Sequence, residues 1–258
     1  MKKIIIYPIK SLGGIQLQKS KASSKGLDLD RRWMLVDENG KFQTQREISE
    51  LALFKTALSE NAVVVSYKND SIEIPTNLNN KIERAVNVFD HDFLANEVDE
   101  EYNQWFSKHL NKHVQLVKMT DISKRIKSFT KPPFESVVSM ADGYPFLILG
   151  TSSMDNLNEK LEVQLSEDRF RPNLYVETQT PHEEDEWDEL KIGETKFLVI
   201  KRCARCQVPT INQMNATKGV EPLKTLSTYR RIENQIFFGA NMILKKEGII
   251  QVGDKVKF

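Results

Sequence analysis

The stretch KRCARCQVPTI, residues 201–211, holds both cysteines of the chain, Cys203 and Cys206. An apolar run at 197–200 precedes it and β-branched residues end it, which predicts that the pair lies between the end of one strand and the start of another. Each cysteine directly follows an arginine. A thiol is a good nucleophile or metal ligand only as the thiolate, and guanidinium groups favour that anion because they stay charged at physiological pH. We therefore expect one of these sulfurs to carry the chemistry.

Several kinds of site fit two cysteines at this spacing. A thioredoxin-like dithiol needs a helix that starts at the pair, and Pro209 with its β-branched neighbours disfavours one. A zinc site needs two further ligands, and we expect none of the four histidines, His91, His109, His113 and His182, to join the cysteines as a ligand. Two interpretations remain: a single thiolate ligand to a metal carried by a cofactor, and a pair of buried, inert thiols.

The composition is that of a globular protein with a hydrophobic core. The 258 residues suffice for one large domain or two of ordinary size, and 40% of them are hydrophobic. A formal net charge of +1 gives no global attraction to nucleic acid or to a membrane surface, so neither is an expected partner. No run reaches the ~18 apolar residues of a membrane-spanning helix, and the apolar start of the chain stops at Pro8, too early for a signal peptide. We expect a cytoplasmic location, where thiols stay reduced.

The first half of the chain is dominated by short strands. Apolar and alternating runs predict strands at 2–7, 15–18, 32–37, 41–46, 53–59, 62–67, 71–74, 83–89 and 114–117. Asn39 and Gly40 tolerate positive φ and predict a hairpin between 32–37 and 41–46. Residues 98–110 have apolar side chains at helical spacing and acidic residues in the first turn, which predicts one amphipathic helix. Strands this short and this frequent are typical of a β-barrel or sandwich.

The second half begins after a basic stretch and again favours strands. Residues 118–136 are rich in Lys, Arg, Ser and Pro, which predicts a long loop or domain joint. A strand at 144–149 leads into Gly150, Thr151 and Ser152, whose hydroxyls are natural caps for a following helix. A strand, a glycine turn and a helix N-terminus together suit an anion. A short helix at 221–230 and strands at 236–238, 241–245 and 255–258 complete a mainly β protein with some helices, an α+β chain.

Six motifs in order resemble those of one family. They are YPIKS at 7–11, DRRWMLV at 30–36, FRPN at 170–173, WDEL at 187–190 with Ile192-Gly193 after it, RCARC at 202–206 and FGAN at 238–241. The chain resembles the MOSC superfamily, named for the molybdenum cofactor sulfurase C-terminal domain, together with that family's N-terminal β-barrel partner. The resemblance implies a β-barrel domain at about 1–120 and a MOSC β-barrel domain at about 130–258, with a site between them and the first strand free to cross over.

Within that superfamily the chain resembles the amidoxime reducing components and their bacterial counterparts. The resemblance implies a molybdenum-molybdopterin cofactor whose metal is held by the thiolate of Cys206, and reduction of small N-hydroxylated substrates by two electrons. Arg205 is then expected to help keep the sulfur anionic, and Cys203 is an optional neighbour at the cofactor. Binding of pyridoxal phosphate is a further possibility that the resemblance leaves open.

The resemblance also implies a set of cofactor ligands drawn from distant parts of the chain. They are Lys10, Ser11, Arg31, Arg32, Thr151, Ser152, Arg171 and Asn173. Lysine, arginine and hydroxyl groups suit the phosphate of the cofactor, and an asparagine can both donate and accept hydrogen bonds at a pterin edge. Each also has an ordinary structural interpretation, such as a helix cap at Thr151 or an ion pair between Arg171 and Asp168 or Glu167.

Partners and alternatives follow from two departures from the family. Asn212 stands where relatives often have aspartate, so a proton shuttle there is doubtful. No cysteines remain for an iron–sulfur domain, so electrons are expected from a separate donor protein of the iron–sulfur, flavin or haem type. An acidic donor could dock on the basic residues Lys118, Lys124, Arg125, Lys127 and Lys131. The alternative functions are a sulfur carrier, with a persulfide on cysteine, and a carrier that binds the cofactor without catalysis.

Overall fold

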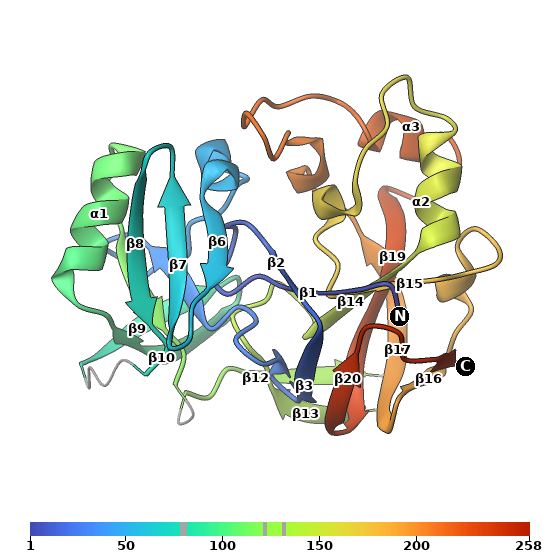
Figure 1. Ribbon diagram of the computed structural model, residues 1–258, viewed down its shortest axis with the longest axis horizontal. Coiled ribbons are helices and arrows are strands. Elements are labelled where there is room, and N and C mark those ends of the chain that lie inside the picture. The colour runs from blue at the N-terminus through green and yellow to red at the C-terminus, as the bar shows by residue number, and fades with distance from the viewer. Residues whose placement is uncertain (78–81, 121–122, 131–132) are drawn as a thin grey trace.

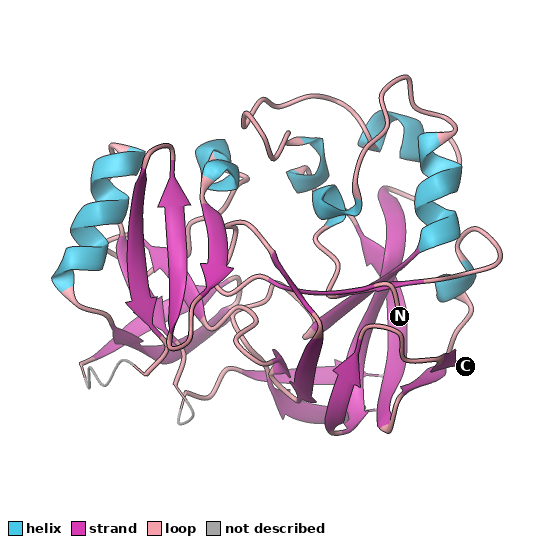
Figure 2. Cartoon of the chain, in the orientation of Figure 1, coloured by secondary structure: helices cyan, strands magenta, loops and turns pink. Residues whose placement is uncertain are grey.

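The structure is a computed structural model that describes residues 1–77, 82–120, 123–130 and 133–258. Figure 1 shows two lobes: one contains β6–β8 and α1, and the other contains the long strands β17 and β19 with α2 and α3. Strands dominate both lobes and the helices lie at their periphery (Figure 2). The expectation of a mainly β chain with some helices is confirmed.

The larger lobe is built on a nine-stranded sheet. Its order is β2-β1-β15-β14-β19-β17-β16-β21, with β18 paired to β19. The bounds are β1 Lys3–Ile6, β2 Ile15–Leu17, β14 Phe146–Gly150, β15 Leu174–Val176, β16 Glu189–Ile192, β17 Thr195–Ala204, β18 Arg231–Ile232, β19 Gln235–Lys246 and β21 Val256–Lys257. β14 and β15 pair in parallel, and their other neighbours pair antiparallel. The helices α2 Thr151–Asn158 and α3 Leu223–Ser227 cover one side, with Leu157 and Leu226 in one cluster with Phe170 and Phe238.

The smaller lobe consists of two sheets and one helix. The sheets have the orders β5-β11-β10-β9 and β6-β7-β8. The bounds are β5 Trp33–Val36, β6 Lys55–Leu58, β7 Ala62–Tyr67, β8 Asp70–Pro75, β9 Glu83–Val88, β10 His91–Glu97, β11 Gln115–Lys118 and α1 Glu100–Leu110. Tyr102 and Phe106 of α1 pack on Phe54 and its neighbours, because the apolar residues of this helix recur on one face. The helix ends at Asn111, whose left-handed φ of 47° is typical of a C-cap.

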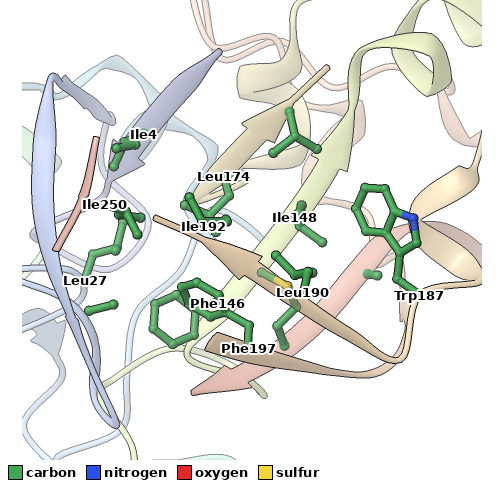
Figure 3. Close-up of a cluster of buried hydrophobic side chains, with 14 of the residues drawn as sticks. Ile4, Leu27, Phe146, Ile148, Leu174, Trp187, Leu190, Ile192, Phe197 and Ile250 are labelled. Atoms are coloured by element: carbon green, nitrogen blue, oxygen red, sulfur yellow. The ribbon is translucent and has the colours of Figure 1, made fainter. Parts of the chain in front are cut away.

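The N-terminal residues join the larger lobe. β1 pairs with β15, and β3 Lys19–Ser23 pairs with β4 Gly26–Leu27 and with β20 Gly248–Gln251. Side chains from both ends of the chain therefore share one core, in which Ile4 and Leu27 lie with Ile250 (Figure 3). The first strand does cross over, and the lobes do not divide at one point in the sequence. The boundaries 1–120 and 130–258 remain a prediction.

Three local expectations were wrong. The basic stretch 118–136 is not one loop: β12 Ile126–Thr130 and β13 Pro133–Val137 pair antiparallel, and the rings of Phe129 and Phe134 stack 4.9 Å apart. The second arm of the predicted hairpin is a single bridge from Phe42 to Val36, because the chain turns away at Thr44. The segment after Cys206 is a short 3-10 helix, Val208–Thr210, rather than a strand.

Two further strands differ from the prediction. The two strands expected at 236–238 and 241–245 are one strand, β19, which bends at Gly239 where φ is +72°. β10 was not foreseen, although it pairs with β9 along six residues. The remaining short elements are 3-10 helices at Ser49–Leu53, Glu167–Phe170 and Glu183–Asp185. Among the described residues, no helix is long and apolar enough to cross a bilayer.

Candidate functional site

A cavity of about 390 Å³ is lined by residues from both lobes. It collects eight of the predicted site residues, namely Lys10, Ser11, Arg31, Arg171, Asn173, Cys203, Arg205 and Cys206. Segments 44–46 and 141–144 and the residues Phe89 and Lys201 also contribute to its walls. Side chains up to 196 positions apart in the sequence thus meet at one place, as the predicted ligand set requires.

The two cysteines lie where β17 ends. Cys203 is the second-last residue of the strand and half-buried, whereas Cys206 follows the strand and is exposed. The amide of Arg205 donates to the carbonyl of Ile236 at 2.8 Å, which extends the pairing with β19 beyond Ala204. The 3-10 helix that starts at Val208 then turns the chain away. Both thiols are free and both line the cavity, but only Cys206 is exposed in it.

The sequence predicts that Arg205 keeps the sulfur of Cys206 anionic, but in the structure a different arginine lies beside each thiol. Arg205 donates to Cys203 Sγ at 3.1 Å and to the carbonyl of Phe170 at 2.8 Å, so it is directed to Cys203. The arginine next to Cys206 is Arg46, from the smaller lobe. Burial acts to lower the pKa of Arg46, but the negative charges of Asp142 and Cys206 outweigh it and raise that pKa.

A buried lysine and a carboxylate form the next part of the wall. Lys10 is 4% exposed, donates to the carbonyl of Met140 at 2.8 Å and forms an ion pair with Asp142. Asp142 also pairs with Arg46. Burial lowers the pKa of Lys10 to about 8, partly offset by Asp142. Burial favours the neutral form of Asp142, yet Lys10 and Arg46 hold the pKa of this carboxyl well below its usual range.

Arg125 contacts the segment that carries Asp142, and it is buried rather than a surface charge. It is 1% exposed and donates to the carbonyls of Ser139, Ala141 and Asp142, at 2.7 Å for the first. It therefore holds the segment that carries Asp142. The prediction that Arg125 belongs to a basic docking surface is therefore wrong. Of the other residues predicted for that surface, Lys124 is exposed and Lys131 lies outside the described residues.

Arg31, Arg171 and Asn173 are organised around Tyr7. The guanidinium carbons of Arg31 and Arg171 lie 4.5 and 4.1 Å from the Tyr7 ring centroid. Arg31 donates to Asn173 Oδ1 at 3.1 Å and to the buried carboxylate of Asp30 at 2.7 Å. Asn173 Nδ2 in turn donates to a β1 carbonyl at 3.1 Å, which fixes the orientation of its amide. These contacts hold both guanidinium groups in place at the cavity wall.

Arg171 has no ion-pair partner within the described parts of the chain. The carboxylates named as alternatives bind elsewhere: Glu167 pairs with Lys3 at 2.5 Å, and Asp168 accepts from Ser166 at 2.5 Å. Arg171 itself sits at a left-handed φ of 55°, directly after the 3-10 helix. Burial lowers its pKa to about 10. An uncompensated cation in the wall is suited to an anionic ligand.

Family comparison fits this arrangement. The model of the MOSC N-terminal beta barrel domain matches residues 1–113, and that of the MOSC domain matches residues 135–257. Mitochondrial amidoxime reducing component 2 of Bos taurus is 30% identical over 273 residues, which cover 97% of this chain and 80% of the relative. The chain belongs to the MOSC family.

Other relatives of this MOSC chain carry two different names. Mitochondrial amidoxime-reducing component 1 of Homo sapiens is 27% identical, over 97% of this chain and 80% of the relative. Molybdenum cofactor sulfurase of Arabidopsis thaliana is 30% identical, over 99% of this chain but 35% of the relative. The MOSC chain thus spans about a third of the sulfurase. The sulfurase name links the family to the molybdenum cofactor, whereas the cytoplasmic location and pyridoxal phosphate binding stay predictions.

Three predicted ligands of the MOSC chain lie outside the cavity lining. Arg32 donates to the carbonyls of Lys25 and Asp30, at 2.9 and 2.7 Å, and so holds a turn. Thr151 and Ser152 start α2 and bind Thr178, with Ser152 Oγ donating to its carbonyl at 2.6 Å. Their hydroxyls tie the helix to the next loop.

Two residues of the site could not be found from the sequence. Arg46 and Asp142 carry no motif signal, since Arg46 falls in a stretch predicted as strand and Asp142 follows one predicted as loop. Asn212 accepts from the amide of Met214 at 2.8 Å and shapes a turn instead of facing the cavity. A second cavity, of about 310 Å³, shares Arg171 but contains neither cysteine.

The charge of the cavity wall is strongly one-sided. Six cationic side chains line it, namely Lys10, Arg31, Arg46, Arg171, Lys201 and Arg205, and Asp142 is the one acidic residue of the described lining. In the described parts of the chain, no three His, Cys, Asp or Glu side chains come together as a metal-binding group. The wall therefore suits a ligand with several negative charges, next to a single exposed thiol.

Proposed function

We propose that this MOSC chain binds the molybdenum cofactor in the cation-lined cavity and reduces small N-hydroxylated compounds there. The observation that carries the proposal is the convergence of six cations and the exposed Cys206 on one cavity. The cofactor is a phosphate ester with a dithiolene, so it needs positive charge, and its metal accepts a soft thiolate ligand. The residues present fit such a group.

The residues of the chain supply binding and orientation. In this proposal Lys10, Arg31 and Arg171 hold the anionic part of the cofactor, and Asn173, whose amide is fixed by hydrogen bonds, binds the heterocycle; their shared position at the cavity supports this. Cys206 is the sulfur ligand, with Arg46 beside it to stabilise the anion. When bound, the cofactor supplies the two-electron chemistry that converts an N–OH group, two electrons and two protons into N–H and water. We infer that the electrons come from a separate donor protein.

Metal analysis of cysteine variants tests this function. Protein made in a host that synthesises the cofactor should contain molybdenum and pterin, and Cys206→Ser should lose at least nine-tenths of the metal because the soft ligand is gone. Cys203→Ser is the matched control and should keep more than half of it. Turnover of an N-hydroxylated compound with chemically reduced viologen as donor should follow the metal content. Metal-free wild-type protein, or full activity in Cys206→Ser, would sink the proposal.

A sulfur carrier is the second candidate, because Cys203 shares the cavity with Cys206 and is bound by Arg205. In that case the Cys206 thiolate takes the outer sulfur of a persulfide donor, which leaves as a thiol. Cys203 can then attack Cys206 Sγ, which releases the outer sulfur as sulfide and leaves a Cys203–Cys206 disulfide. Mass spectrometry that finds an added sulfur atom on metal-free protein favours this candidate. Metal bound without turnover favours a cofactor carrier.

A further inference from the structure

Phe89 occupies a strained position at the cavity wall. It lies in the two-residue turn between β9 and β10, where Val88 pairs with His91. Its φ of 54° is left-handed, which bulky residues rarely adopt because Cβ approaches the following carbonyl. The side chain is 46% exposed and lines the cavity. Because the Phe89 side chain is exposed, packing in the hydrophobic core does not explain the strained backbone. Strained backbone positions are concentrated at ligand sites.

Contacts with two neighbours fix the Phe89 ring. The ring of Phe42 lies 5.0 Å away at an interplanar angle of 60°. The guanidinium carbon of Arg46 lies 5.4 Å from the Phe89 centroid, so the residue beside Cys206 also contacts this ring. Arg46 therefore lies between the Phe89 ring and the sulfur of Cys206.

A second aromatic residue reaches the cavity from the larger lobe. Tyr144 is half-buried, and Lys127 Nζ and Lys201 Nζ lie 5.4 and 5.5 Å from its ring centroid. The cavity therefore combines a cationic wall with aromatic rings from both lobes: Phe89 from the smaller lobe, and Tyr144 and Phe170 from the larger one.

The cationic side chains and the aromatic rings of the cavity suit different ligands. Cations favour the anionic cofactor, but an N-hydroxylated amidine is uncharged near neutral pH and gains little from them. Its affinity has to come from apolar and ring contacts. A flat conjugated molecule offers the most contact to an aromatic side chain, whereas a small aliphatic one offers little.

We propose that Phe89 is a specificity-determining residue that favours aromatic N-hydroxylated substrates over small aliphatic ones. This inference rests on the proposed function. Phe89 contacts the ring of the substrate while the N–OH group is directed toward Cys206, and Tyr144 provides a further ring on the wall of the same cavity.

Steady-state kinetics with two substrates test the inference on cofactor-loaded protein, with reduced viologen as donor. Benzamidoxime represents the aromatic class and acetamidoxime the aliphatic class. Phe89→Ala should raise the KM for benzamidoxime about three- to tenfold, the loss of one aromatic contact, and leave the KM for acetamidoxime within twofold. Phe89→Tyr keeps the ring and should restore the wild-type value. Leu94→Ala is the control, since Leu94 is 48% exposed on the same hairpin but outside the lining.

Molybdenum and pterin content, measured on every variant, separates the alternatives. Loss of cofactor from Phe89→Ala would assign the ring to the pterin and overturn the inference. Equal changes in KM for both substrates, or no change for either, would overturn it as well. If the wild-type protein carries the cofactor and reduces neither amidoxime, the proposed function fails before Phe89 is tested.

Discussion

Lys10 is the residue through which pH acts on the cavity. Its pKa is lowered from 10.5 to about 8 by burial, so it is protonated below pH 8 and loses its charge above. Anion affinity should therefore be fully present below pH 8 and fall as pH rises through that value. For sulfate, which keeps its charge over this range, we expect about a tenfold loss between pH 7 and pH 9.5, the worth of one charge-assisted hydrogen bond.

Isothermal titration of cofactor-free protein with sulfate measures this effect. Lys10→Arg is the matched variant, because a guanidinium keeps its charge across the range and should give a nearly flat profile. The bound anion itself favours protonated Lys10, so the midpoint in the complex should lie somewhat above 8. A wild-type profile as flat as that of Lys10→Arg would show that Lys10 does not contribute its charge to the site.

The residues that the sequence could locate are those whose role is encoded by local motifs. Lys10, Arg171 and Cys206 belong to motifs and all line the cavity. Arg46 and Asp142 escaped prediction because their roles depend on a pairing across 96 positions that no local pattern reveals. Arg32 also belongs to a motif, but it lies outside the cavity lining and its guanidinium binds a nearby turn.

Within the strands, the bend of β19 sets the direction in which the cysteine segment runs. Arg202 pairs with Ala240 but Ala204 pairs with Phe237, so β19 contains one extra residue opposite the end of β17. Gly239 lies in that bulge at a φ of +72°, and a Cβ there would be 2.8 Å from the carbonyl oxygen of Ile148. The bulge thus requires a residue without a side chain.

Gly239→Ala should destabilise the protein by roughly 2–4 kcal/mol, because backbone strain and a clash with a carbonyl add together. Gly253→Ala is a matched control: its φ is +93°, but a Cβ there meets nothing within 4 Å. Backbone strain alone should cost it about 1 kcal/mol. Urea unfolding of both variants gives the two values, and equal losses would mean that the contact with Ile148 has no effect.

Among the elements, those with clear periodicity were predictable. Helix α1 and strand β7 lie where apolar spacing placed them. The hairpin β12–β13 was missed because its composition is that of a loop, and its order comes from tertiary contacts: Phe129 packs in one cluster with Val138 and Ile243. Position in the fold, rather than strand propensity, makes this segment a hairpin.

At the scale of the whole molecule, a reciprocal pair of amides joins the lobes beside the cavity. Gln45 is fully buried, and Gln45 Nε2 donates to Gln213 Oε1 at 3.2 Å while Gln213 Nε2 donates to Gln45 Oε1 at 3.1 Å. Lys55 Nζ adds a hydrogen bond to the carbonyl of Gln213 at 2.8 Å. Gln45 is adjacent to Arg46 in the sequence, so the contact that joins the lobes lies next to the arginine beside Cys206, and we expect it to help position that arginine.

Each single substitution in this pair should lower the free energy of unfolding by more than half of what the double substitution costs. Gln213→Ala leaves Oε1 of the buried Gln45 amide without its donor, although Nε2 keeps its hydrogen bond to the carbonyl of Ser11, and an unsatisfied buried group costs about 1–3 kcal/mol. Gln45→Ala has the same effect on Gln213, whereas the double variant leaves neither amide unpaired. Its loss of unfolding free energy should therefore be smaller than the sum of the two single losses by about 1 kcal/mol. Urea unfolding of the four proteins completes the cycle, and sulfate affinity should fall in each variant as Arg46 loses its support. Strictly additive losses, with sulfate affinity unchanged, would mean that the lobes are held together elsewhere.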